Sequence, residues 1–269
     1  MPTITLLNQK GGVGKTSTCY HLAGTLAQLG RRVLLVDNDP QASLTQGFLG
    51  PQATRQLEPA ETIAAAYAQE AIPDQVIRPA GVAGVDLLAG SRHAASYNVP
   101  DAPDADWSTQ TALREFIADV GPRYDVVLID CPPNLHLCSW AALVASDALV
   151  VPLQPEDFGA QGIADVQESI ERVRSGPNPG LVLLGFLITM SNARLAVHKG
   201  FEQLLRSLYG LTVFETVIPI SADFKEAIIQ RRPVAQYKPR GSAAKIMKAL
   251  AEELSARLSG ARGTTQEAA

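Results

Sequence analysis

The chain contains 269 residues, of which 46% are hydrophobic and 19% charged, the balance of a globular protein with one substantial core. No apolar run approaches the roughly 20 residues that span a bilayer, and the start lacks the features of a secretion signal, so we expect a cytoplasmic protein. The net charge of −4 excludes a protein coated in positive charge.

Short apolar runs alternate with helical stretches, a pattern that predicts βαβ units and a mostly parallel twisted sheet flanked by helices on both faces. We expect one α/β domain over residues 1–259, a disordered polar tail over 260–269, and a ligand site at the C-terminal strand ends. The expected strands are 3–8, 32–37, 85–89, 124–130, 148–153, 181–189 and 212–215, and the expected helices are 15–29, 60–70, 158–174, 196–209, 222–230 and 242–259.

The segment KGGVGKT, residues 10–16, lies between the first expected strand and helix, which is the position of a phosphate-binding loop. Its glycines allow successive N–H groups to point inward, and the following helix adds its positive dipole end. The common G-x-x-x-x-G-K-[ST] pattern wants a glycine at position 9, where this chain has Gln9 followed by an additional lysine. The expected nucleotide contacts are Lys10, Gly11, Gly12, Val13, Gly14, Lys15, Thr16 and Ser17.

Three of these residues have expected roles of their own. Lys15 is expected to contact the β- and γ-phosphates, Thr16 to hold Mg²⁺, and Ser17 to donate to the α-phosphate. Two acidic residues are expected to support the metal. Asp130 ends the apolar strand VVLID, where a charge is costly unless it binds a metal or joins a hydrogen-bond network. Asp37 ends its own strand and is expected to support Mg²⁺ through water, although a turn or helix-cap role is the alternative.

The quoted segments resemble the ParA/MinD family, whose phosphate loop is a deviant Walker A box with a lysine before the first glycine. NQKGGVGKTS followed by RVLLVDNDPQAS is similar to the Soj-type ParA branch, and YDVVLIDCPPN looks like the family's Walker B strand. ALVVPLQPEDFGAQGI, LGFLITM and VFETVIPIS follow in the family's order, so the resemblance covers nearly the whole chain. It implies a single-domain P-loop NTPase that binds ATP and Mg²⁺ and hydrolyses ATP slowly.

The resemblance also assigns individual residues. Glutamine is common at Gln9 in ParA proteins, and Lys10 matches the signature lysine that reaches the ATP of the partner subunit in a homodimer. Asp39 matches the aspartate that orients the attacking water, so Lys10, Lys15 and Asp39 form the expected catalytic set. The expected adenine contacts are Met190, Pro219 and Ser221, but this chain departs from the family's IPRN by carrying IPIS, with Ile220 in place of arginine.

The basic residues concentrate in the last third of the chain. Residues 190–269 contain 12 Lys or Arg and 7 Asp or Glu, whereas residues 1–189 contain 11 and 20. This asymmetry predicts one electropositive face, although solvated helix surface would give the same counts. Because phosphate contacts need only positive charge at suitable spacing, the expected DNA contacts are Arg194, Lys199, Lys225, Arg231, Arg232, Lys238, Arg240, Lys245 and Lys248.

The family resemblance implies a nucleoid-associated positioning ATPase that binds double-stranded DNA without sequence preference and is stimulated by a ParB-like partner. Because the first strand begins at residue 3, we expect no preceding helix-turn-helix domain. A membrane-bound regulator of the MinD type is the alternative, but the apolar face of the last helix, with Ile246, Leu250 and Leu254, is expected to pack on the core. An iron–sulfur electron-transfer ATPase is disfavoured because Cys131 and Cys138 lack the matching contexts.

Overall fold

The computed structural model describes the backbone of residues 1–155 and 160–267, and the side chains of residues 1–155 and 163–261. A seven-stranded sheet in the order β3-β4-β2-β5-β1-β6-β7 forms the centre of the molecule. All neighbouring strands pair in parallel except β3 and β4, which are antiparallel at one edge. The strands are β1 Thr3–Leu6, β2 Val33–Asp37, β3 Ile77–Val82, β4 Val85–Leu88, β5 Val126–Asp130, β6 Ala148–Leu153 and β7 Val182–Ile188.

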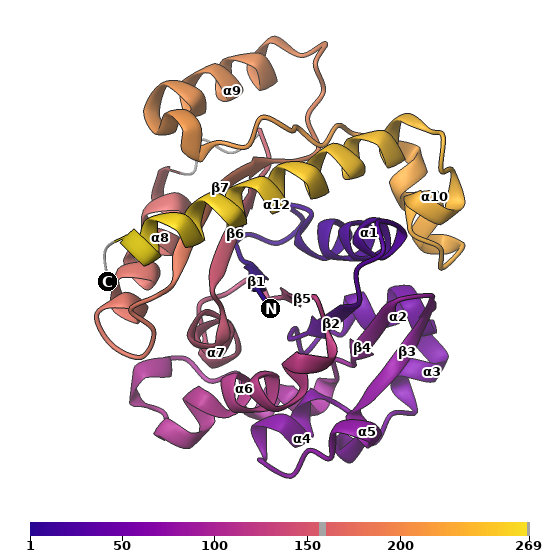
Figure 1. Ribbon diagram of the computed structural model, residues 1–269, viewed down its shortest axis with the longest axis vertical. Coiled ribbons are helices and arrows are strands. Elements are labelled where there is room, and N and C mark those ends of the chain that lie inside the picture. Colours follow the sequence, from indigo (N-terminus) through magenta and orange to yellow (C-terminus); the bar gives the residue numbers. More distant parts are fainter. Residues whose placement is uncertain (156–159, 268–269) are drawn as a thin grey trace.

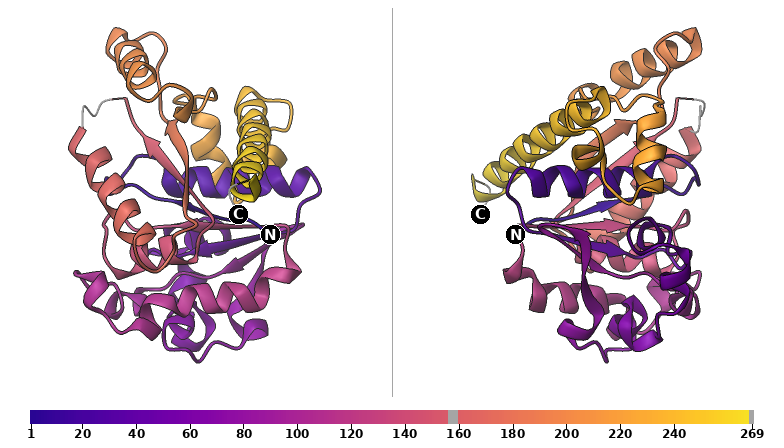
Figure 2. Two further views of the ribbon diagram at one scale, coloured as in Figure 1. Left: turned by 60° about the vertical axis from the view of Figure 1, so that its left-hand side comes forward. Right: turned by 90° about the vertical axis from the view of Figure 1, so that its right-hand side faces the viewer.

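Helices cover both faces of this sheet, which confirms the predicted α/β class (Figures 1 and 2). The α-helices are α1 Lys15–Gln28, α2 Ser43–Leu49, α3 Pro51–Arg55, α4 Ile63–Tyr67, α5 Pro73–Val76, α6 Trp107–Val120, α7 Leu137–Ala145, α8 Ala160–Arg174, α9 Ala196–Tyr209, α10 Ala222–Ile229, α11 Val234–Tyr237 and α12 Ser242–Glu267. Five short 3₁₀ turns complete the described elements: η1 Pro59–Glu61, η2 Arg92–Ser96, η3 Ala102–Asp104, η4 Gly121–Arg123 and η5 Gly210–Thr212.

Two hydrophobic clusters lie on opposite faces of the sheet. One contains the buried faces of α1 and α12, and the other contains those of α6 and α7. The central strands β2 and β5 are buried along their whole length, as expected for apolar strands that are covered on both faces. This arrangement brings the C-terminal ends of β1, β2 and β5 together beside the N-terminus of α1.

Several sequence-based boundaries were wrong. The helix expected over 60–70 is divided into η1 and α4, because Thr62 is extended and its hydroxyl caps α4 by accepting from Ala64 N. The strand expected over 212–215 is reduced to an isolated bridge between Val213 and Phe186. Helix α12 continues to Glu267, so residues 260–267 are helical where a disordered tail was expected, although Gly260, Gly263, Thr264 and Thr265 have low helix propensity.

The first residues of one predicted helix, 158–159, and the last two residues of the predicted tail lie outside the described residues. Helices α6 and α7 and the antiparallel strand β3 were not predicted at all.

Candidate nucleotide site

The glycine-rich loop connects β1 to α1 at the C-terminal edge of the sheet. Gly12 and Gly14 have φ values of 79° and 85°, in the left-handed region that side chains of other residues rarely adopt. Gly14 caps α1, and its carbonyl accepts the first helical hydrogen bond, from Thr18 N at 2.8 Å. These glycines are therefore required by the backbone turn that leads into the helix.

Lys15 lies inside this turn and is 6% exposed. Its ammonium group donates to the carbonyl oxygens of Asn8 at 2.9 Å and Lys10 at 2.8 Å. Burial lowers the pKa of Lys15, and the negative charges of Asp130 and Asp39 oppose this shift. An ammonium carries three donors, so one N–H remains for an anionic ligand beyond these two loop bonds.

Two polar residues that sequence reasoning missed hold the loop against the sheet. Asn8 donates from Nδ2 to Pro152 O of β6 at 2.7 Å, and its Oδ1 accepts from Lys10 N at 3.0 Å. The hydroxyl of Thr189, just after β7, donates to Val13 O at 2.7 Å. A buried polar residue directly after an apolar strand is the signal that could have identified both.

The remaining predicted loop residues differ in exposure. Lys10, Gly11 and Gly12 are exposed, whereas Thr16 and Ser17 at the start of α1 are half-buried. The loop thus presents Lys10 at the surface of the protein and Lys15 within it.

Asp37 and Asp130 face each other across neighbouring strand ends, since they are paired in the register of β2 and β5. Both are 0% exposed. Neither carboxylate oxygen of Asp130 has a hydrogen-bond partner within the described part of the chain. Burial raises the pKa of Asp130 well above its usual range and the charge of Asp37 adds to the shift; the Thr16 hydroxyl lies near enough to moderate it but does not meet hydrogen-bond geometry. A buried carboxylate without partners is suited to a divalent cation or to water that such a cation orders.

Asp37 is more completely engaged. Its Oδ2 accepts from Thr45 N at 2.7 Å and from the Thr45 hydroxyl at 2.6 Å, and that hydroxyl accepts from Gly90 N at 2.8 Å. Burial raises the pKa of Asp37 to about 7, and the two Thr45 hydrogen bonds oppose the shift. A Cβ on Gly90 would lie 2.6 Å from Asp37 Cγ, so this contact requires glycine. Asp37 therefore anchors α2 to the strand ends, a role that its position in the sequence did not reveal.

Asp39 lies in the loop that follows β2 and is 9% exposed. Its Oδ1 accepts from Gln41 N at 2.9 Å. Burial raises the pKa of Asp39, whereas the Gln41 N–H and the charge of Lys15 lower it. The structure thus brings Asp39 close enough to Lys15 for their charges to interact.

The residue before it, Asn38, fixes this loop from the side. Asn38 Nδ2 donates to Cys138 O at 2.6 Å, and Asn38 Oδ1 accepts from the Tyr67 hydroxyl at 2.8 Å. Its backbone N–H also donates to Asp130 O at 2.9 Å. The backbone next to Asp39 is therefore held by α4, α7 and β5 together.

The predicted adenine residues meet on one side of the loop. Met190 has a φ of 51°, and its terminal methyl would lie 3.5 Å from a Cβ on Gly14. Ser191 and Pro219 form a parallel bridge, which brings the segment before α10 next to the end of β7. Ser221 caps α10 by accepting from Asp223 N at 3.3 Å, so its hydroxyl already has a structural partner.

The nine predicted DNA residues are all exposed, but they do not have equal surroundings. Lys238 forms ion pairs with Asp223 at 2.6 Å and Glu226 at 3.0 Å. Lys248 lies 3.7 Å from Glu252, whereas Lys245 has no ion pair within the described part of the chain. The positive charge is therefore partly neutralised within the same surface.

Comparisons with known proteins agree with this geometry. A family model described as an AAA domain matches residues 1–183. The chromosome-partitioning ATPase Soj of Thermus thermophilus is 40% identical over 263 residues, covering 95% of this chain and 96% of that protein. The chromosome partitioning protein ParA of Caulobacter vibrioides is 34% identical, with 94% of each chain covered.

Among solved structures, cobyrinic acid a,c-diamide synthase from Mycobacterium smegmatis with bound ATP analog and magnesium superposes with a TM-score of 0.79 at 26% identity. The match covers 94% of this chain and 93% of that one. The parallel sheet, the loop around Lys15 and the extent of the sequence matches lead to one conclusion: the chain belongs to the ParA/Soj family of partition ATPases within the P-loop NTPases.

Proposed function

We propose that this protein binds ATP with Mg²⁺ and hydrolyses it slowly. The observation that carries the proposal is the pair formed by Lys15, which has one unused N–H donor inside the loop, and Asp130, a fully buried carboxylate without a hydrogen-bond partner among the described residues. Lys15 binds the β- and γ-phosphates, and Thr16 and Asp130 hold the metal directly or through water. The metal, once bound, neutralises charge that develops on the phosphates.

Asp39 orients the attacking water in this proposal. Burial raises the pKa of the Asp39 carboxyl, and its charge interaction with Lys15 places it near the phosphates that Lys15 binds. The Asn38 contacts support this role because they keep the backbone next to Asp39 in one position.

Lys10 acts in a homodimer. It is exposed at the loop surface, so its side chain can reach a nucleotide held by a second copy, while Lys15 serves the nucleotide of its own subunit. A γ-phosphate between two subunits presents charge to both, so a lysine in trans makes dimerisation depend on the bound nucleotide.

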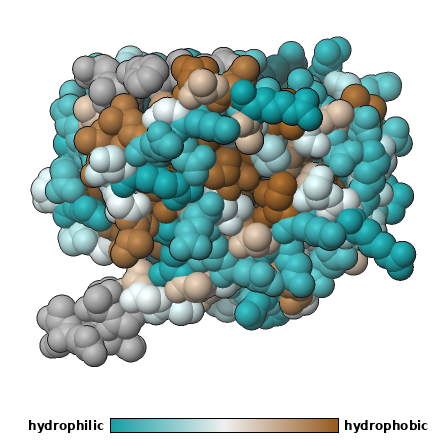
Figure 3. All heavy atoms as spheres, turned by 90° about the horizontal axis from the view of Figure 1, so that it is seen from above, coloured by the Kyte–Doolittle hydropathy of each residue, from teal (hydrophilic) through white to brown (hydrophobic). Residues whose placement is uncertain are grey.

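The ATP-bound dimer then binds double-stranded DNA without sequence preference, and a ParB-like partner stimulates hydrolysis and release. Figure 1 places α9, α10 and the start of α12, which carry or adjoin the nine basic residues, along one edge of the molecule. On the face seen from above the view of Figure 1, hydrophobic residues are interspersed with hydrophilic ones (Figure 3). Ile220 is 60% exposed at the position of the family's arginine, so DNA contact here depends on the surrounding Lys and Arg.

A membrane-bound regulator is the weaker candidate. No helix within the described residues is long and apolar enough to cross a membrane. Leu250 and Leu254 of α12 are buried in the core cluster, which confirms the prediction that this apolar face packs inward. Because this apolar face packs inward, we propose DNA rather than lipid as the surface that this ATPase covers, with nucleoid association as its location.

A gel-shift assay with random-sequence DNA tests the function. DNA should be retarded with ATP but not with ADP or without nucleotide, and binding should weaken steeply between two salt concentrations. Lys10→Ala is the matched variant, since it should still bind nucleotide but remain monomeric with ATP on size-exclusion chromatography. Binding to anionic vesicles but not to DNA would favour the membrane candidate, and a full Lys10→Ala dimer would refute the trans role.

A further inference from the structure

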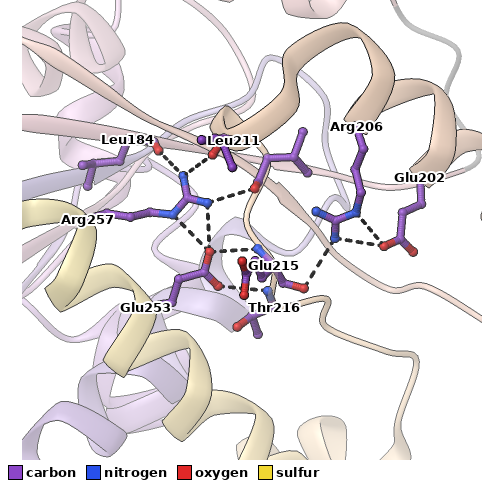
Figure 4. Close-up of polar contacts among 9 residues, drawn as sticks. Leu184, Glu202, Arg206, Leu211, Glu215, Thr216, Glu253 and Arg257 are labelled. Atoms are coloured by element: carbon purple, nitrogen blue, oxygen red, sulfur yellow. Dashed lines mark hydrogen bonds and ion pairs between the residues drawn. The ribbon is translucent and has the colours of Figure 1, made fainter. Parts of the chain in front are cut away.

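A single arginine in the second half of α12, Arg257, connects three segments of the molecule. Arg257 donates from Nη1 to Leu184 O of β7 and to Leu211 O, both at 2.9 Å, and from Nη2 to Val213 O at 2.9 Å (Figure 4). Its guanidinium also lies over the ring of Phe214, 4.2 Å from the ring centroid. A planar fork of donors is the group suited to several fixed carbonyl oxygens at once.

Glu253, one turn earlier on α12, completes this arrangement. It accepts from Glu215 N at 2.8 Å and Thr216 N at 2.9 Å, and it forms an ion pair with Arg257 at 2.9 Å (Figure 4). Burial opposes its charge, but the Thr216 and Glu215 N–H groups outweigh burial and hold the pKa of Glu253 below its usual value. The side chains of Arg257 and Glu253 are only 19% and 16% exposed, so this is a shielded pair.

The segment that this pair holds leads directly into the predicted adenine contacts. On its other side, Phe214 N donates to Phe186 O and Ile218 N donates to Ile188 O, both at 2.9 Å. The next residue, Pro219, forms the bridge with Ser191. Residues 213–219 are thus held between the last strand and α12 by hydrogen bonds to their backbone groups.

We infer that Glu253 and Arg257 are positioning residues that fix the segment carrying the predicted adenine contacts Pro219 and Ser221, and so determine affinity for the base. This inference rests on the proposed ATP site. Neither residue touches the nucleotide; they act through the backbone between Val213 and Pro219. The phosphate end of the site, which is built by the loop around Lys15 on β1 and α1, shares none of these contacts.

Because the base end and the phosphate end of the site are held by different contacts, the test compares two ligands. Mg·ATP has both base and phosphates, whereas Mg·tripolyphosphate has the phosphates but no base. Glu253→Gln and Arg257→Lys should each weaken Mg·ATP binding about 10-fold, in line with one lost base contact, and leave tripolyphosphate binding unchanged. Glu253→Gln keeps an acceptor and the side-chain shape, so it removes the charge without leaving a cavity. Glu252→Gln, which breaks the exposed Lys248–Glu252 pair on the same helix, is the matched control and should bind both ligands like wild type.

Equal weakening of both ligands would overturn the inference, because it would mean that the pair only stabilises the fold. Unchanged ATP binding in both variants would overturn it as well. If wild-type protein itself bound tripolyphosphate as tightly as ATP, the predicted adenine contacts would be wrong, and that result is separate from the behaviour of the variants.

Discussion

The nucleotide edge of the sheet and the basic C-terminal surface use charge in opposite ways. At the nucleotide edge, Lys15, Asp37 and Asp130 are buried at strand ends and the first turn of α1, where the backbone fixes their positions. On the C-terminal surface, Lys238 and Lys245 are exposed on long side chains, and Lys238 is paired with two carboxylates.

The difference shows where a single substitution should matter. Buried charges act in a low dielectric without competition from water, so removing one changes binding strongly. Exposed charges are screened by salt, and several of them contribute to the same interaction, so removing one changes binding little. The predictions below test this contrast, from the largest expected effect to the smallest.

Lys15→Ala removes the buried ammonium that the loop surrounds. ATP binding should weaken at least about 100-fold, the loss expected when a charge-assisted contact to phosphate disappears from a shielded site. Isothermal titration with Mg·ATP checks this, with Lys225→Ala on the exposed face of α10 as the control. Binding within a few-fold of wild type would show that the loop is not the phosphate site.

Asp39→Ala should retain ATP but hydrolyse it about 100-fold more slowly, because the group that orients the water is gone. Asp39→Asn is the matched variant, since it keeps an acceptor for Gln41 N but cannot take a proton. Steady-state phosphate release measures turnover, and filter binding measures retained ATP. Normal turnover in the asparagine variant would contradict the proposed role.

His21 joins the two regions, because this buried residue of α1 accepts from Val234 N of α11 at 3.2 Å. Burial lowers its pKa to about 3, against a weaker opposing effect of the Phe224 backbone. As pH falls below the ordinary histidine pKa, His21 becomes protonated in the unfolded chain but stays neutral in the folded chain, so the free energy of unfolding decreases. The unfolding free energy should drop on the order of 2 kcal/mol more in wild type than in His21→Gln between pH 7 and pH 5.

Urea denaturation at the two pH values measures this difference. Equal losses in wild type and the glutamine variant would mean that His21 does not drive the pH dependence.

The smallest effect is expected on the basic surface. Lys245→Ala should weaken DNA binding about 3-fold and reduce the salt slope by about one, as expected for one phosphate contact. Lys238→Ala should change either quantity less, because its ammonium is already neutralised by Asp223 and Glu226. Fluorescence anisotropy at several salt concentrations provides both numbers. A larger loss for Lys238→Ala would show that its ion pairs open on DNA.

Much of the site could be predicted because its signals are local. Single strand–turn–helix units contain the loop glycines, Lys15 and the acidic residues at the ends of VLLVD and VVLID. Strands that are buried on both faces appear in the sequence as continuous apolar runs. The β1, β2 and β5 strands were identified within a few residues for the same reason.

The sequence alone therefore indicated the fold class, the phosphate loop and the family. Only the tertiary structure decided what each side chain contacts. Asp37 accepts from Thr45, whereas Asp130 has no hydrogen-bond partner in the part of the chain that the structure describes. Asn38 fixes the loop beside Asp39, and Arg257 binds carbonyls 44 to 73 residues away in the chain. Hydrogen bonds between distant segments leave no periodic trace, because they depend on which strand ends and helix faces the complete fold brings together.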